Sequence, residues 1–342
     1  MKIAVDAMGG DFAPEQIVFG AIRAAKKFEC EIVLVGDPNK IKEVLDKNSS
    51  WKNLKISIHP AADVIEMNEH PGAAVRRKKD ASVVVATRLV KDGECDAVLS
   101  AGSTGAAVAS ALLGLGRIKG IDRPTIATPI PTTHGATLLM DSGANVDSKP
   151  RHLVQGALMG SIYSEYVFGV KSPRVGLLNI GEEETKGNEQ ALATYPLLKN
   201  MKTINFIGNA EGRDIPKGSF DVVICDGFVG NVVLKFAEGL AKTILKLIKE
   251  AVKDGGIFAK MGAFLLAPAL RKLAKRVDSS EYGGAPLLGV NGCCIIGHGA
   301  SNAKAICSAI GVANEYVKNN VLEHIKDNIA KEEVLNNDNG EK

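Results

Sequence analysis

Short apolar runs alternate with longer segments of helical periodicity along most of the chain. Continuous apolar runs such as Glu31–Val35 predict buried strands, and apolar residues three or four positions apart, as in Pro14–Phe28, predict helices. The predicted strands are Lys2–Val5, Glu31–Val35, Leu54–Ile58, Asp96–Leu99, Val175–Asn179, Thr203–Ile207, Val222–Cys225 and Cys293–Ile296. The predicted helices are Pro14–Phe28, Pro38–Lys47, Ala81–Lys91, Thr104–Leu115, Glu189–Lys199, Asn231–Lys253 and Asn302–Lys318.

Strands that alternate with helices are typical of βαβ units, which build a mostly parallel sheet covered by helices on both faces. We therefore expect an α/β fold. Thr125–Ile130 and Ala136–Met140 follow each other closely, so an antiparallel hairpin or an edge addition is expected there. We predict one domain over residues 1–330, with a segment at 255–282 that protrudes from it, and a polar C-terminal tail over 331–342.

Composition places the chain among ordinary globular proteins, with 45% hydrophobic and 24% charged residues. The 42 Lys and Arg residues nearly balance the 39 Asp and Glu residues, so the net charge of the chain does not indicate a nucleic-acid partner. The six cysteines show neither C-x-x-C nor zinc-finger spacing, which favours buried reduced thiols and no metal site. No secretory signal pattern and no run of about 20 apolar residues is visible, so we expect a cytoplasmic protein.

Glycine, at 36 of 342 residues, gathers in turns that follow predicted strands. Five such turns are Asp6–Asp11, Ser100–Gly105, Asn179–Glu189, Cys225–Asn231 and Gly297–Asn302. In a parallel sheet, these turns would all lie at the carboxyl edge, where ligands bind. Each leads into a helix start, which offers free N–H groups and a partial positive charge. One such turn can be only a tight turn or a helix cap, but five favour a phosphate or another small oxyanion.

Several familiar motifs are missing from the sequence. G-x-x-x-x-G-K-[ST] and G-x-G-x-x-G do not occur, which argues against a P-loop ATPase and a standard dinucleotide fold. The G-x-S-x-G elbow and H-E-x-x-H do not occur either. The glycine-rich turns therefore need another explanation.

Eight segments together resemble the phosphate acyltransferase family. They are Asp6–Asp11, Met67–Pro71, Ser100–Ala106, Lys186–Glu189, Asn209–Ile215, Asp221–Lys235, Glu281–Gly292 and Ile295–Ala305. The resemblance runs from residue 1 to about residue 320, and Ser103 stands where the family pattern has Asn, which changes a donor but not the turn.

The resemblance implies an enzyme that transfers a long-chain fatty acyl group from acyl-[acyl carrier protein] to inorganic phosphate. The acyl phosphate product would feed a downstream membrane glycerol-3-phosphate acyltransferase in phospholipid synthesis. The implied fold is a Rossmann-like three-layer α/β/α sandwich, similar to isocitrate and isopropylmalate dehydrogenases and to phosphotransacetylases. The family also implies a homodimer without a cofactor, for which the helix Asn231–Lys253 is a candidate contact.

Attack of phosphate on a thioester requires a held phosphate, a stabilised oxyanion and a thiolate that can leave. Because the second pKa of a phosphate ester is about 6, a dianion is available without a Ser-His-Asp triad. Lys186 is the first catalytic candidate, as a cation in a glycine-rich turn before a helix. His298 stands between two glycines and could donate to the oxyanion or the leaving sulfur, and Asn231 is the third candidate. The alternatives are a surface lysine, a structural histidine and a helix cap.

The remaining site candidates lie in the same turns. The expected substrate-binding residues are Gly9, Gly10, Asp11, Ser103, Thr104, Gly105, Asn188, Gly227, Gly230, Gly299 and Ser301. Asn188 can equally be only a helix cap. Asp6, Asp11 and Asp226 are better suited to orient donors than to touch phosphate, although a divalent metal bound by them is a less favoured alternative.

Two basic segments could contact partners. Arg76, Arg77, Lys78 and Lys79 form either a solvated face or a docking surface for the acidic acyl carrier protein. Residues 255–277 hold five basic residues and no acidic one, with leucines on one helical face and basic residues on the other. This pattern suits the surface of an anionic membrane, through Phe264, Leu265, Leu266, Leu270 and Leu273, which would hold the enzyme at the inner face of the cell membrane. A core-facing helix or a dimer contact is the alternative.

Three other functions compete with acyl transfer from the carrier to phosphate. A short-chain phosphotransacetylase would use coenzyme A as the acyl donor. An NAD-dependent hydroxy-acid dehydrogenase of the isocitrate type would need a nucleotide motif and a metal carboxylate cluster, which we do not find. A membrane-docked scaffold would bind carrier protein or phosphate without turnover.

Overall fold

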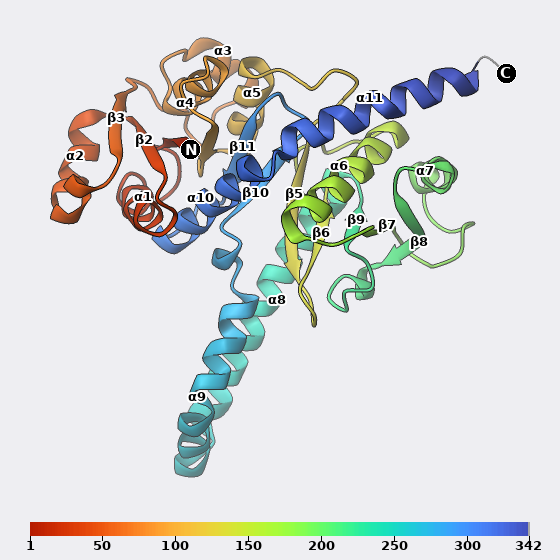
Figure 1. Cartoon of the computed structure of the whole chain (residues 1–342). Coiled ribbons are helices and arrows are strands. Elements are labelled where there is room, and N and C mark those ends of the chain that lie inside the picture. The colour runs from red at the N-terminus through yellow and green to blue at the C-terminus, as the bar shows by residue number, and fades with distance from the viewer. Residues whose placement is uncertain (341–342) are drawn as a thin grey trace.

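One 11-stranded sheet runs through the molecule in the order β3-β2-β1-β4-β11-β10-β5-β6-β9-β7-β8 (Figure 1). This computed structural model describes residues 1–340; of residues 277, 279 and 333–340 only the backbone is described. The strands are β1 (Lys2–Asp6), β2 (Glu31–Gly36), β3 (Ile56–Pro60), β4 (Ala97–Ser100), β5 (Thr125–Pro131), β6 (Ala136–Met140), β7 (Arg174–Asn179), β8 (Asn205–Glu211), β9 (Val222–Ile224), β10 (Gly284–Leu288) and β11 (Cys293–Gly297).

Helices cover both faces of this sheet and extend beyond it. They are α1 (Glu15–Phe28), α2 (Pro38–Asp46), α3 (Pro71–Arg77), α4 (Ser82–Lys91), α5 (Thr104–Gly114), α6 (Pro150–Phe168), α7 (Glu189–Asn200), α8 (Gly227–Asp254), α9 (Gly256–Val277), α10 (Ala303–Lys318) and α11 (Val321–Gly340). The predicted α/β alternation and the antiparallel β5–β6 hairpin are confirmed. The helix α11 continues to Gly340, where the sequence predicted a separate tail, and residues 341–342 lie outside the described residues.

Side chains that alternate along the strands build two apolar layers. On β1, Ile3 and Val5 join a cluster with α1, α2, α6, α7, α10 and α11, whereas Ala4 joins a cluster with α3, α4 and α5 on the other face. Val233 and Leu234 of α8 cover the remaining part of that second face, over Leu139 and neighbouring residues. The result is the three-layer α/β/α sandwich that the resemblance implied.

The direction of the strands reverses within the sheet. β10 is antiparallel to both β11 and β5, and β5 is antiparallel to β6. Strands β6, β9, β7 and β8 are parallel to one another and therefore run opposite to β1, β2, β3, β4, β11 and β5. The prediction that all five glycine-rich turns share one carboxyl edge is wrong for this reason. They form two sets at opposite edges of the ladder.

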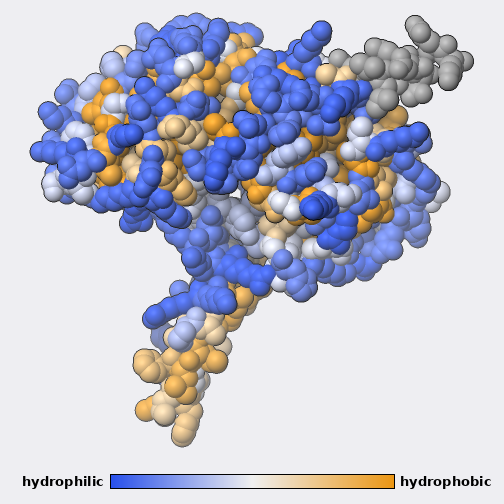
Figure 2. All heavy atoms as spheres, viewed as in Figure 1, coloured by the Kyte–Doolittle hydropathy of each residue, from blue (hydrophilic) through white to orange (hydrophobic). Residues whose placement is uncertain are grey.

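Helices α8 and α9 form a hairpin that projects from the body of the molecule (Figure 1). Its far end is covered with apolar residues, and the part nearer the body is hydrophilic (Figure 2). Two contacts fix its root. Arg276 donates to the carbonyl oxygens of Thr132 and Thr133 in the β5–β6 turn, and Lys304 of α10 lies 2.8 Å from Asp278. The segment predicted to leave the fold is thus one arm of a helical hairpin.

Candidate active site

The first set of turns, residues 6–11, 100–105 and 297–302, lies at the carboxyl ends of β1, β4 and β11. Asp6 is buried beneath it and accepts hydrogen bonds from Met8 N, Gly9 N and Ser100 Oγ, at 3.2, 3.1 and 2.7 Å. Burial raises the pKa of the Asp6 carboxyl above its ordinary value, against the effect of these hydrogen bonds. Asp6 therefore orients backbone donors, as expected for an acid in these turns.

The predicted glycines of the first set allow its three turns to approach one another. A Cβ at Gly9 would lie 2.9 Å from Gly102 N, and one at Gly10, whose φ is +113°, would lie 3.0 Å from Ala101 O. The amide of Asp11 donates to Gly299 O at 2.8 Å, so the first and third turns are joined directly. These close approaches explain the glycines by packing, whether or not a ligand binds.

Other predicted residues of the first set have local structural contacts. Ser103 caps α5 by accepting from Ala106 N at 3.4 Å, directly before Thr104. A Cβ at Gly105 would lie 2.6 Å from Pro71 Cγ. Ser301 is buried, and its Oγ has no hydrogen-bond partner within residues 1–340. Ser301 Oγ is therefore a buried polar atom of this set that the described residues leave without a partner.

His298 is exposed at the end of β11. Its Nδ1 accepts a hydrogen bond from Ala300 N at 3.1 Å. In the neutral imidazole, this contact places the proton on Nε2 and leaves that nitrogen as a donor toward solvent. His298 can therefore donate a hydrogen bond, as the sequence analysis required of it.

The second set of turns includes residues 141–145, which sequence analysis missed. The Asp141 carboxylate is buried at the end of β6. It accepts from Ile126 N, Gly143 N, Ala144 N and both nitrogens of Asn145, at 2.8 to 3.1 Å. Burial raises the pKa of Asp141, and the hydrogen bonds from Ala144 and Asn145 act in the opposite direction. Asp141 thus holds the 141–145 turn in one conformation.

The first turn of α8 packs on the 141–145 turn. Gly227 N donates to Asn145 O at 2.8 Å, and a Cβ at Gly230 would overlap the carbonyl oxygen of Asp141. Asp226 caps the helix by accepting from Val229 N at 2.9 Å, so α8 begins before the predicted start at Asn231. Asn231 is consequently not a cap. Its half-buried side chain lies against the 141–145 turn, 3.7 Å from where a Cβ at Gly143 would be.

Lys186 lies in the turn between β7 and α7. Asn179 Nδ2 donates to Lys186 O at 3.0 Å, Gly187 has a φ of +110°, and Asn188 caps α7 by accepting from Ala191 N at 2.8 Å. The Lys186 side chain is exposed and forms no ion pair within residues 1–340. Its ammonium group is therefore available to an anion.

The segment after β6 connects the two predicted catalytic residues of the second set. Near one end, residues 141–145 contact the first turn of α8, and at the other, Ser148 O accepts a hydrogen bond from Gln190 of α7. Lys186 and Asn231 stand at the starts of the two helices that this segment joins. By contrast, no hydrogen bond or ion pair within residues 1–340 joins His298 to Lys186 or Asn231.

Comparison with known proteins identifies the family. Residues 1–324 match the family model described as "Fatty acid synthesis protein". A phosphate acyltransferase from Desulfitobacterium hafniense (strain DSM 10664 / DCB-2) is 59% identical over 327 residues, which cover 95% of this chain and 97% of the relative. One from Pelotomaculum thermopropionicum is 55% identical over 334 residues, which cover 98% and 96%. The chain belongs to the phosphate acyltransferase family. It is an acyltransferase of fatty acid and phospholipid synthesis.

Solved structures confirm the fold class. A phosphotransacetylase from Streptococcus pyogenes has a TM-score of 0.63 at 16% identity, over 93% of this chain and 94% of that one. A 4-hydroxythreonine-4-phosphate dehydrogenase from Klebsiella pneumoniae has a TM-score of 0.51 at 11% identity, over 92% and 98%. At these identities the likeness concerns the fold alone.

Two further findings concern metal clusters and membrane-spanning helices in the described part of the chain. Within the described chain, no group of three or more His, Cys, Asp or Glu side chains is arranged to hold a metal ion. None of the helices described over residues 1–340 is long and apolar enough to cross a membrane.

Proposed function

We propose that this acyltransferase takes a long-chain fatty acyl group from acyl carrier protein and transfers it to inorganic phosphate. The acyl phosphate product then supplies a membrane glycerol-3-phosphate acyltransferase. Membership of the phosphate acyltransferase family supports phosphate as the acceptor. The acyl carrier protein as donor rests on the sequence resemblance.

The free ammonium group of Lys186 is the observation that carries the assignment of the site. It stands in a glycine-rich turn at a helix start, where backbone N–H groups and the helix dipole also favour an anion. Lys199 of α7, by contrast, pairs with Glu184 at 2.7 Å. A lysine left free in this position suits a substrate that brings its own negative charge.

The chemistry follows from these groups. Lys186 binds the phosphate dianion and reduces its repulsion from the developing oxyanion. A phosphate oxygen attacks the thioester carbonyl carbon, the C–S bond breaks, and the carrier leaves as a thiolate, for which a pKa of about 8.5 is ordinary. The Asn231 amide donates to the oxyanion at the start of α8. The first set of turns lies at the opposite edge of the ladder from Lys186 and Asn231. His298 stays a candidate donor there, and Ser103, Ser301 and the glycines stay candidate substrate-binding residues.

The acyl donor is the point to test first. Purified protein is incubated with phosphate and either palmitoyl-[acyl carrier protein] or palmitoyl-coenzyme A, and acyl phosphate is measured by mass spectrometry. The proposal predicts phosphate-dependent product and free carrier thiol from the carrier substrate. Product from palmitoyl-coenzyme A alone would show that the acyl donor is coenzyme A. Product from neither donor would favour the scaffold, which binds carrier protein or phosphate without turnover.

The α8–α9 hairpin is proposed to hold the enzyme on the inner face of the cell membrane. Phe258, Phe264 and Leu265 near its far end are 84%, 80% and 78% exposed, an arrangement that costs free energy in water unless something covers these side chains. Leu266 and Leu273 are also exposed, and Leu270 is half-buried nearer the root. A lipid surface fits these apolar side chains, and Lys260 stands among them on an arm that has no acidic residue, whereas Arg271, Lys275 and Arg276 of the same arm lie at its root.

The proposed homodimer contact is the outward face of α8. Six apolar residues there, spaced three or four apart, are exposed along the helix: Phe228, Val232, Phe236, Leu240, Ile244 and Leu247. The stripe begins on the body of the molecule and continues along the hairpin shaft. A second copy of the chain, docked through the same stripe, would cover it.

A further inference from the structure

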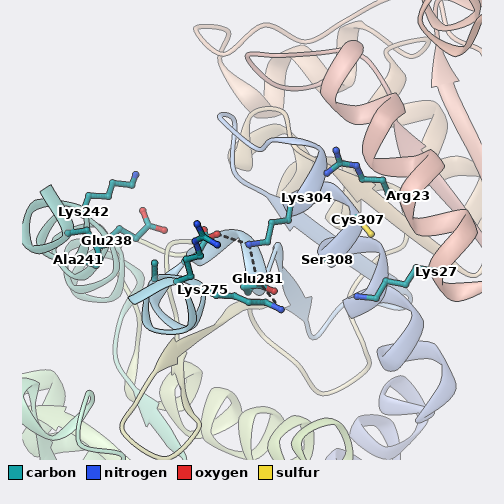
Figure 3. Close-up of a pocket in the computed structure, with 14 residues that line it drawn as sticks. Arg23, Lys27, Glu238, Ala241, Lys242, Lys275, Glu281, Lys304, Cys307 and Ser308 are labelled. Atoms are coloured by element: carbon teal, nitrogen blue, oxygen red, sulfur yellow. Dashed lines mark hydrogen bonds and ion pairs between the residues drawn. The ribbon is translucent and has the colours of Figure 1, made fainter. Parts of the chain in front are cut away.

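A basic cavity lies at the root of the hairpin, between the hairpin and the body (Figure 3). It measures about 760 Å³. Six cationic side chains line it: Arg23 and Lys27 from α1, Lys242 from α8, Arg271 and Lys275 from α9, and Lys304 from α10. Three acids accompany them, so the lining has a net positive charge.

Most of this positive charge is not neutralised inside the cavity. Lys304 pairs with Asp278 and Glu281, at 2.8 and 2.7 Å, and Lys275 lies 3.8 Å from Glu281. Arg23, Lys27, Lys242 and Arg271 form no ion pair within the described residues. Two of these, Arg23 and Lys27, project from α1 on the opposite side of the cavity from Lys242 (Figure 3).

The cavity is lined by helices that begin at both sets of turns. Its wall on α8 begins at Glu238, seven residues and about 10 Å along the helix from Asn231. Its wall on α10 begins at Lys304, just after the 297–302 turn that carries His298. A partner seated in the cavity would therefore lie beside the helices that lead to the candidate catalytic residues.

The cavity also stays accessible in the proposed dimer. At 100° per residue, Glu238, Ala241, Lys242 and Leu245 lie on the face of α8 that is nearly opposite to the exposed apolar stripe. A second copy docked on the stripe would leave the basic face open to another partner.

We infer that this basic cavity is the docking surface for the acidic carrier protein that presents the acyl thioester. The inference rests on the proposed function. It replaces the basic run after His70 as the docking surface, because half of that run is neutralised in the structure: Arg77 and Lys78 pair with Glu69 at 2.8 and 2.6 Å. Charge complementarity at such a surface steers the encounter and lowers the KM for the carrier.

Charge reversal on α1 separates carrier docking from membrane binding. Arg23 and Lys27 are exposed and belong to the body, so Arg23→Glu with Lys27→Glu should preserve the fold and the hairpin. We expect the KM for palmitoyl-[acyl carrier protein] to rise about tenfold at low salt, with kcat, the KM for phosphate and vesicle binding unchanged. In high salt the wild-type KM should approach that of the variant.

The matched control is Arg76→Glu with Lys79→Glu, which makes the same change in charge on two exposed residues of the other basic run. A rise in KM for this control alone, or weaker vesicle binding by the α1 variant, would overturn the inference. If the wild-type protein itself makes no acyl phosphate, the proposed function is wrong, and the docking inference that rests on it is withdrawn with it.

Cys307 gives a second readout that needs no turnover. It lines the cavity and is half-buried, whereas the other five cysteines are buried. Burial raises its pKa, so alkylation should be slow enough to follow by mass spectrometry. Excess carrier protein should slow the alkylation of Cys307 in the wild type and less in the α1 variant. An unchanged rate in the wild type would contradict docking at this cavity.

Discussion

Gly230 is the residue at which the first turn of α8 comes closest to the 141–145 turn. The carbonyl oxygen of Asp141 occupies the place of a Cβ, so even a methyl group requires the two segments to separate. We expect Gly230→Ala to lower the free energy of unfolding by about 3 kcal/mol and to abolish most activity. The measurement is urea unfolding at a fixed protein concentration.

Gly239 in the same helix provides the control. Among the described residues, nothing lies within 4 Å of a Cβ at Gly239, so Gly239→Ala should stabilise the protein by up to about 1 kcal/mol through helix propensity. If the two substitutions change the free energy of unfolding equally, the close packing of Gly230 on Asp141 does not explain the glycine at this position.

The residues of the candidate site could be predicted in part. Lys186 and Asn188 belong to a turn whose glycine and cap are visible in the sequence, and the structure places both where that pattern requires. Asp141 could not be found in this way. Its donors include Ile126, 15 residues away, and the helix turn it supports begins at Gly227, so its role depends on tertiary contacts. The one available signal was a Gly- and Asn-containing turn directly after a buried strand.

The helical hairpin makes its own prediction at the scale of an element. Phe264→Glu with Leu265→Glu places two charges among its exposed apolar side chains, and burying those charges in a bilayer is unfavourable. We expect affinity for vesicles that contain anionic lipid to fall about tenfold or more, with turnover in solution retained. Vesicle sedimentation measures the change.

Leu192→Glu with Leu197→Glu is the matched control, because both leucines are exposed on α7, away from the hairpin. Vesicle binding that survives the hairpin change, or that falls equally in the control, would contradict membrane attachment through this element.

Elements with a clear period were predicted, and those without one were missed. Helix α6 is buried around most of its circumference and includes Gly156 and Gly160, so it shows no polar face. Strand β10 contains Pro286 and begins at the second residue of the pair Gly283–Gly284, a pattern more typical of a turn. Helix α8 starts before Asn231 because Asp226, rather than Asn231, caps it.

At the scale of the whole molecule, the exposed stripe on α8 predicts the state of association. Phe236 is 68% exposed near the middle of the stripe. Phe236→Glu should convert a dimer into a monomer, because two copies of the new charge would meet without a partner. Light scattering after size-exclusion chromatography gives the mass. A monomeric wild type, or a dimer that persists in the variant, would place the contact elsewhere.

The strand order of the sheet could not be predicted from the sequence. The βα pattern indicates local connections, whereas the strand order depends on β10, which pairs with β11 near it in sequence and with β5 about 160 residues away. The β5–β6 hairpin reverses the direction of the strands that follow it in the sheet, but its place beside β10 is set by pairing with a strand distant in sequence. The two sets of turns could therefore not be separated from the sequence pattern.

The role of Lys186 is tested most directly by transfer of labelled phosphate. The protein is incubated with palmitoyl-[acyl carrier protein] and radioactive inorganic phosphate, and label in the acyl product is counted for wild type, Lys186→Ala, Lys186→Arg and the exposed control Lys202→Ala. We expect kcat/KM for phosphate to fall about 100-fold or more in Lys186→Ala, partly to recover in Lys186→Arg and to stay unchanged in Lys202→Ala. Wild-type incorporation of label by folded Lys186→Ala would contradict the assignment of this site.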